Sequence, residues 1–137
     1  MNDSSNPLTA SELSALVSMQ LGVWDVDLPT GVITSNPRCR ALLGLPPDQE
    51  ITIDSWKASV HRDDLTRILA TIEQALSHTL AEPFSAEYRC VAADGQERWL
   101  CATAHLQPRS SLMQGMRVVG TLWDVTARVV AERQLAE

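Results

Sequence analysis

The chain has 137 residues, which is enough for one hydrophobic core and too few for two domains of ordinary size. Hydrophobic residues make up 45% of it, so disorder of the whole chain is excluded. The formal net charge is -6 and Lys57 is the only lysine, so we expect binding neither to nucleic acid nor to an anionic membrane.

The N-terminal residues predict a short helix that covers another surface. Residues 1–8 are polar and are expected to fray. Thr9 and Glu12 form a capping box, after which apolar residues recur at helical spacing to about Met19. The apolar face of this helix consists of Leu13, Leu16 and Val17.

Two short strands are expected next. Trp24, Val26 and Leu28 alternate with aspartates, which is typical of a half-buried strand. A turn at residues 29–31 leads to a second strand at 32–34.

Three helices are predicted to follow. Two are short, at about 37–43 and 55–60, and the third is long, at about 63–79. Asp63 and Asp64 are expected to cap the long helix at its positive end. One face of this helix is apolar and consists of Leu65, Ile68, Leu69, Ile72 and Leu76.

Three strands complete the domain, at about 83–92, 97–107 and 116–125, and Asp94-Gly95 marks the turn between the first two. We favour a three-residue loop that ends at a left-handed Gly95 over a two-residue loop. Only the three-residue loop gives one face that is apolar apart from a tyrosine hydroxyl, which then consists of Phe84, Ala86, Tyr88, Cys90, Leu100, Ala102, Ala104 and Leu106.

The last strand is apolar on both faces, since Val118 and Leu122 alternate with Val119 and Trp123. A strand of this kind is covered on both sides, so it belongs in the middle of the sheet. Residues beyond it begin a helix that leaves the domain. The order of elements indicates the α+β class, with an antiparallel sheet packed by helices on one face.

Short motifs recur along the chain in a definite order. They are Gly22-Val23-Trp24-Asp25, Trp56, Val60-His61-Arg62-Asp63-Asp64, Glu87-Tyr88-Arg89, Asp94-Gly95, Arg98-Trp99 and Asp124-Val125-Thr126. Together, from about residue 22 to residue 137, they resemble a PAS domain followed by its PAC segment. The chain departs from the family pattern at Arg62, where a proline is usual, and at Ala127 and Val129, where charged residues are usual.

The resemblance implies a five-stranded antiparallel sheet in the order 2-1-5-4-3 that cups a small cavity beneath the long helix. The domain would span residues 9–126, and residues 127–137 would begin a signalling helix. Members of the family sense small ligands or dimerise, and pass a change through this helix to an effector. We therefore expect a homodimeric sensory input module, with an effector such as a histidine kinase or diguanylate cyclase in the same chain.

The residues expected to serve this function fall into three groups. The first group surrounds a pocket that either binds a small apolar ligand or is filled by the protein's own side chains. It is expected to involve Trp24, Val26, Trp56, Leu69, Tyr88, Cys90, Leu100, Ala102 and Leu122. Asp124 and Thr126, with Thr126 capping the exit helix, are expected to transmit the signal. The opposite face is expected to pack under the N-terminal helix or to form a dimer contact through Leu13, Leu16, Val17, Trp99 and Trp123.

The sequence contains no catalytic motif, so we expect no enzymatic activity from this chain and no cofactor. Haem is one alternative, with His61 as its candidate ligand. Flavin is another, although Cys39 precedes the usual position of a reactive cysteine and the inward positions of the late strands hold no amide side chains. The three cysteines form no CxxC pair, which favours a reducing cytoplasm.

Overall fold

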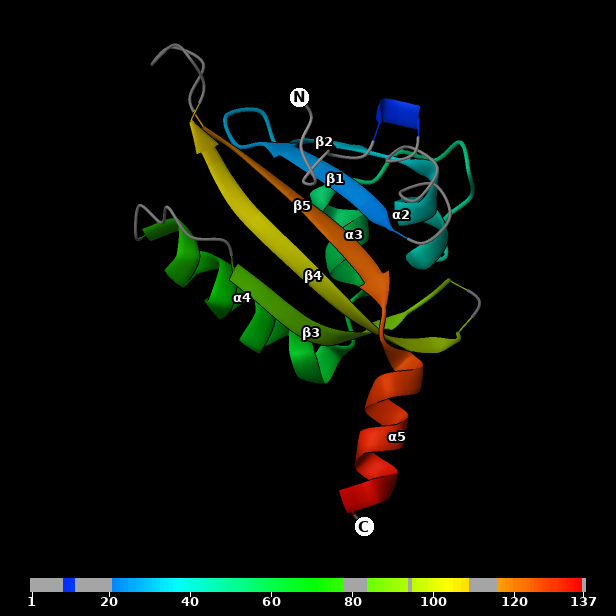
Figure 1. Ribbon diagram of the computed structural model, residues 1–137. Helices are drawn as coiled ribbons and strands as arrows, with labels where there is room; N and C mark the ends of the chain where they lie inside the picture. Colours follow the sequence, from blue (N-terminus) through cyan, green and yellow to red (C-terminus); the bar gives the residue numbers. More distant parts are fainter. Residues whose placement is uncertain (1–8, 12–20, 78–83, 94, 109–115, 137) are drawn as a thin grey trace, which may run out of the picture.

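The computed structural model describes residues 9–11, 21–77, 84–93, 95–108 and 116–136. The helices and strands within these ranges are β1 (Gly22–Asp27), β2 (Val32–Ser35), α2 (Pro37–Leu42), α3 (Ile53–Ser59), α4 (Arg62–Ser77), β3 (Phe84–Val91), β4 (Glu97–Pro108), β5 (Met116–Asp124) and α5 (Thr126–Ala136). Figure 1 shows the sheet with α5 projecting away from it.

The five strands form one antiparallel sheet in the order β2-β1-β5-β4-β3. The predicted order is thereby confirmed, and β5 lies at the centre between β1 and β4. Val118 and Leu122 face one side of β5, while Val119 and Trp123 face the other. Val118 and Leu122 are buried, while Val119 and Trp123 on the other face are half-buried.

The hairpin between β3 and β4 has the predicted three-residue loop. Tyr88 lies opposite Leu100 and Ala86 opposite Ala102, so their side chains share one face of the sheet. Gly95 has a φ of 87°, in the left-handed region that glycine adopts without strain. The loop length therefore sets the register that turns the apolar residues of both strands to the same side.

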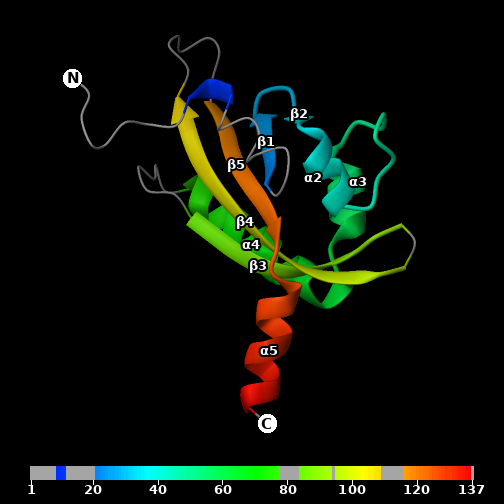
Figure 2. The same ribbon diagram turned by 45° about the vertical axis from the view of Figure 1, so that its right-hand side comes forward.

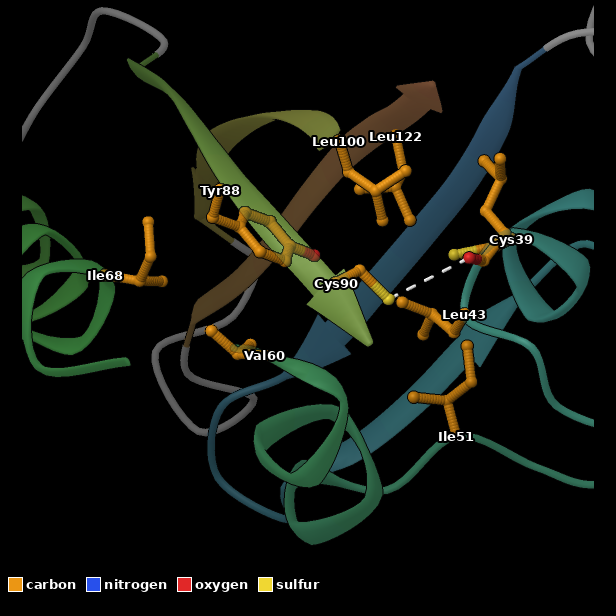
Figure 3. Close-up of a cluster of buried hydrophobic side chains, with 10 residues drawn as sticks. Cys39, Leu43, Ile51, Val60, Ile68, Tyr88, Cys90, Leu100 and Leu122 are labelled. Carbon is orange, nitrogen blue, oxygen red and sulfur yellow. Dashed lines mark hydrogen bonds between the residues drawn. The ribbon is translucent and has the colours of Figure 1, made fainter. Parts of the chain in front are cut away.

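Helices α2, α3 and α4 lie on one side of the sheet, which we call the inner face, and the other side is the outer face (Figures 1 and 2). The main core lies between these helices and the inner face, and Figure 3 shows part of it. Its buried members are Cys39, Leu42, Leu43, Ile51, Val60, Ile68, Tyr88, Cys90, Leu100 and Leu122.

Asn36 fixes α2 against the first strand. Its side-chain oxygen accepts hydrogen bonds from the backbone N–H groups of Val23 and Cys39, each at 3.0 Å. Its amide nitrogen donates to the Leu21 carbonyl at 3.1 Å. One side chain thus caps the helix and ties it to β1, which holds Cys39 over the inner face.

The prediction that Asp63 and Asp64 cap α4 is wrong. His61 provides the cap, since its backbone oxygen accepts from the Asp64 and Leu65 N–H groups and its Nδ1 accepts from the Asp63 N–H. Both aspartates lie in the first turn of the helix, where negative charge is favourable. The carboxylate of Asp64, however, binds Arg89 of β3 instead of a helix amide.

Candidate functional site

A cavity of about 340 Å³ lies between the inner face of the sheet and helices α2, α3 and α4. Its wall is almost entirely apolar. Seven of the nine residues expected at a ligand pocket lie in this wall: Trp24, Val26, Trp56, Leu69, Tyr88, Ala102 and Leu122. The strands, α3 and α4 supply these side chains because their alternating and helical periods turn apolar residues inward.

Two expected pocket residues, Cys90 and Leu100, do not line the cavity. Both are 0% exposed and belong to the packed core. The Cys90 thiol lies 3.9 Å from the Leu42 carbonyl, which accepts its weak hydrogen bond. Periodicity gave their face correctly, but it carries no information about their position along the strand relative to the cavity.

Several lining residues were not predicted to belong to the pocket. Ile72 lies on the predicted apolar face of α4 and could have been included from that pattern. Ile51 precedes α3 in a segment without periodicity, and Cys39 enters the wall because Asn36 fixes α2. These two positions depend on tertiary packing, which leaves no mark in the local sequence.

The cavity wall contains one buried hydroxyl group of an aromatic side chain, that of Tyr88. Tyr88 is 1% exposed, and its oxygen accepts a hydrogen bond from the indole nitrogen of Trp56 at 3.2 Å. The two rings meet edge to face, with centroids 6.4 Å apart and an interplanar angle of 82°. Burial raises the pKa of Tyr88 far above its ordinary value, so the hydroxyl stays protonated at neutral pH.

The other polar groups in the wall have partners or reach solvent. The Thr71 hydroxyl donates to the Arg67 carbonyl at 3.0 Å, one turn earlier in α4. The Trp24 indole nitrogen donates to the Thr121 carbonyl at 3.2 Å. Lys57 is exposed and contributes the only cationic side chain among the described lining residues. The interior of the cavity therefore presents little besides apolar surface and Tyr88.

The start of α4 runs along the free edge of β3. The Asp64 carboxylate accepts three hydrogen bonds from Arg89: from its backbone N–H at 2.8 Å, Nε at 3.0 Å and Nη2 at 2.7 Å. The His61 N–H donates to the Arg89 carbonyl, and Arg67 donates to the Glu87 carbonyl. These bonds satisfy an edge that would otherwise be open to another strand.

The hydrogen bond from Arg89 is also the largest influence on the acidity of Asp64. Together with the nearby positive charges of Arg89 and Arg67, it lowers the pKa of Asp64 from 3.8 to about 2, against the opposing effect of burial. Asp64 is 5% exposed. The carboxylate is thus held ionised and paired at the junction of the pocket-lining helix and the sheet.

The exit from β5 into α5 is fixed by hydrogen bonds, one of which the Thr126 hydroxyl donates to the Trp99 carbonyl at 3.4 Å. The Asp124 carboxylate accepts from the Thr126 N–H at 2.8 Å, and the Thr126 hydroxyl accepts from the Trp99 N–H at 2.9 Å. The Val125 N–H donates to the Trp99 carbonyl at 2.8 Å. The prediction that Thr126 caps the exit helix is therefore wrong. Asp124 accepts from the first helix amide, while Thr126 binds the helix to β4.

Trp99 also has two guanidinium groups over its ring. Arg89 lies 5.5 Å from the ring centroid and Arg133 of α5 lies 4.9 Å from it. A second link between α5 and the sheet is the ion pair of Arg128 with Glu87 of β3. Residues of β3, β4 and α5 thus meet around one tryptophan.

A second hollow, of about 480 Å³, lies on the outer face beside the start of α5 and is more open to solvent. Polar side chains border much of it, unlike the inner cavity. Its residues are Leu21, Arg38, Thr103, Thr121, Trp123 and Asp124.

The sequence model of the family described as "PAS fold" matches residues 32–122, which is more than half of the chain. The chain belongs to the PAS family. The predicted resemblance is thereby confirmed, and the sheet order agrees with it. No helix in the described ranges is long and apolar enough to cross a membrane.

Known relatives of this PAS domain are signalling proteins. It is 30% identical over 118 residues to a "Blue-light-activated histidine kinase" of Brucella ovis, covering 85% of the chain and 22% of that protein. It is 27% identical over 86 residues to the "Sensor protein FixL" of Bradyrhizobium diazoefficiens, covering 63% of this chain and 17% of that protein. The chain thus spans about a fifth of the curated relatives it matches.

A solved structure agrees with these relatives. A "Sensory Box Histidine Kinase/Response Regulator" from Burkholderia thailandensis superposes with a TM-score of 0.72 at 28% identity, covering 91% of this chain and 92% of that one. This PAS domain is therefore homologous to the sensor modules of signal-transduction proteins.

The structure places the candidate residues for the two cofactors weighed from the sequence as follows. His61 is not in the cavity wall, and its ring nitrogens face the Asp63 N–H and the Glu97 carboxylate. The described lining residues include no histidine and no amide side chain to hold a flavin ring. Cys39 does line the cavity, but burial raises the pKa of its thiol to about 11.

The outer face of this PAS domain carries Trp99 and Trp123, as expected. Both pack against buried Cys101, Val125 and Val129, so the first turn of α5 covers part of this face. The other residues expected there, Leu13, Leu16 and Val17, lie outside the described residues.

Proposed function

We propose that this PAS domain is a sensory input module that binds a small apolar molecule in the inner cavity and signals through α5. The observation that supports the proposal most directly is the cavity itself. An apolar cavity of 150 Å³ holds one benzene molecule, as known from an engineered example, and ligand pockets begin at about 300 Å³. At about 340 Å³, the cavity has room for a ligand of roughly two rings.

The homology to sensor modules supports a role in which α5 leads to an effector in the same protein, such as a histidine kinase or diguanylate cyclase. We assign no catalytic step and no cofactor to this domain. The described residues contain no group of three or more His, Cys, Asp or Glu side chains that could hold a metal ion.

We further propose that the module acts as a homodimer in the cytoplasm, with α5 as part of the contact. Val130 is 42% exposed and Leu135 is 88% exposed on this helix. Apolar residues exposed on a projecting helix favour a second helix as partner.

The proposal is tested by titrating the purified domain with tetralin, a bicyclic hydrocarbon, while amide chemical shifts and the melting temperature are followed. We expect saturable shifts at the cavity and in α5, and a rise in melting temperature. Ala102→Phe places a ring inside the cavity and should weaken binding at least tenfold. Ser85→Phe adds the same ring to an exposed outer-face position of the neighbouring strand and should not.

Two results would overturn the proposal. One is the absence of saturable binding, or equal binding to the two variants, which would show that the cavity takes no ligand. The other is a purified protein with a Soret or flavin absorption band, which would replace the apolar ligand by a cofactor.

A further inference from the structure

Tyr88 has one hydrogen-bonding function that the described residues leave unused. An indole N–H can only donate, so in the bond with Trp56 the Tyr88 oxygen is the acceptor. The proton of the Tyr88 hydroxyl is therefore still available. Among the described residues, the bond from Trp56 is the only one that this hydroxyl makes.

The position of the hydroxyl makes this unused proton significant. Tyr88 is 1% exposed and lies in the cavity wall, and Figure 3 shows its ring reaching from β3 toward the middle of the core. A buried donor that finds no acceptor costs free energy. Burial also raises the pKa of Tyr88, so the group stays a donor across the physiological pH range.

The remaining polar groups of the wall do not compete for this role. The Thr71 hydroxyl and the Trp24 indole are both engaged with backbone carbonyls. Lys57 is exposed, so an anionic ligand placed beside Tyr88 would be desolvated without a buried counter-charge. A pure hydrocarbon would leave the Tyr88 proton unpaired. A neutral molecule with a single acceptor satisfies both conditions.

We propose that the ligand of this cavity is a neutral apolar molecule of about two rings that carries one carbonyl oxygen, which accepts a hydrogen bond from Tyr88. This inference rests on the proposed function, since it concerns the same cavity. Tyr88 then selects among apolar molecules by chemistry, while the rest of the wall selects by size.

The test compares two molecules of nearly the same shape, 1-tetralone and tetralin, which differ by a carbonyl. Their dissociation constants are measured by calorimetry for the wild type, for Tyr88→Phe and for Thr71→Val. The ratio of the two constants corrects for any general effect of a variant on the cavity. Thr71→Val also removes a hydroxyl from the wall, but one that is already bonded within α4.

We expect Tyr88→Phe to reduce the preference for the ketone roughly tenfold, which is the size of one net hydrogen bond. Thr71→Val should leave the preference unchanged. If Tyr88→Phe leaves the ratio of the two dissociation constants unchanged, the inference is overturned. As long as both molecules still bind the cavity, that result leaves the proposed function intact. Failure of both molecules to bind the wild type would overturn the proposed function itself.

A measurement on the wild type keeps the inference testable if Tyr88→Phe fails to fold. The carbonyl carbon of 1-tetralone, labelled with carbon-13, resonates further downfield when its oxygen accepts a hydrogen bond. We expect the bound ketone to show a downfield shift relative to the ketone in cyclohexane. A bound resonance at the cyclohexane position would overturn the inference.

Discussion

Replacing Asp64 by asparagine isolates the charge that holds α4 to the edge of the sheet. Asp64→Asn keeps the shape of the side chain but removes the negative charge that accepts three hydrogen bonds from Arg89. Asp63→Asn is a matched control, because the neighbouring side chain has the same chemistry and is 68% exposed. The two variants change the net charge of the protein equally.

The expected magnitude follows from the lowered pKa of Asp64, which falls from 3.8 to about 2 mainly through the hydrogen bond from Arg89. A difference of nearly two pH units between the unfolded and folded pKa values corresponds to about 2 kcal/mol of folding stability. Because the folded-state pKa is the lower one, this stability is fully present above about pH 4 and disappears as the pH falls toward 2.

The assay is urea unfolding at pH 7, 5, 4, 3 and 2. At pH 7 we expect Asp64→Asn to be about 2 kcal/mol less stable than the wild type, and Asp63→Asn to lie within about 0.5 kcal/mol of it. The gap for Asp64→Asn should close between pH 4 and pH 2 as the wild type loses the ionised carboxylate. A gap that stays constant down to pH 2 would refute the assignment of this stability to the ion pair.

Two substitutions and one reactivity measurement test the packing around the cavity and the exit helix. Thr126→Ala removes the acceptor of the Trp99 N–H and should cost about 1 kcal/mol, with faster amide exchange in α5 and an intact sheet; global unfolding would contradict this. Gly120→Ala places a Cβ 1.9 Å from the Thr103 carbonyl oxygen. We expect the free energy of unfolding in urea to fall by about 3 kcal/mol or more. A stability close to that of the wild type would refute the clash. The raised pKa of the Cys39 thiol, about 11, predicts alkylation by iodoacetamide at pH 8 roughly 100-fold slower than for free cysteine, measured by peptide mass spectrometry; equal rates would refute it.

Part of the sheet could be predicted from local features, whereas its full strand order came from the resemblance to the PAS family. The alternation of apolar residues gives the face of each strand, and the three-residue loop ending at Gly95 gives the register of β3 and β4. The apolar character of both faces of β5 gives its central position. These features need only the neighbours along the chain, so a single sequence carries them.

The polar contacts could not be predicted because they depend on where distant side chains arrive. Asp64 lies in the first turn of a helix, where an aspartate is usually interpreted as a cap. Its carboxylate instead binds Arg89, which lies 25 residues later in the chain. The reversal of roles at the exit helix has the same origin. The Thr126 hydroxyl binds the backbone of Trp99, 27 residues earlier in the chain. The Asp124 carboxylate therefore accepts from the helix amide in its place.

The positions of Asp64, Arg89 and Trp99 bear on how a signal would reach α5. The cavity and α5 lie on different sides of the sheet, so a ligand in the cavity does not touch the exit helix. Arg89 connects the two sides at the sheet edge, because its guanidinium is fixed by Asp64 of α4 and also lies over the ring of Trp99. Any displacement of α4 by a ligand must therefore either strain the pair of Asp64 with Arg89 or move Arg89 with it. Since the backbone of Trp99 holds the first residues of α5, this tryptophan offers one connection from the cavity to the helix, beside β5 itself, whose Leu122 lines the cavity.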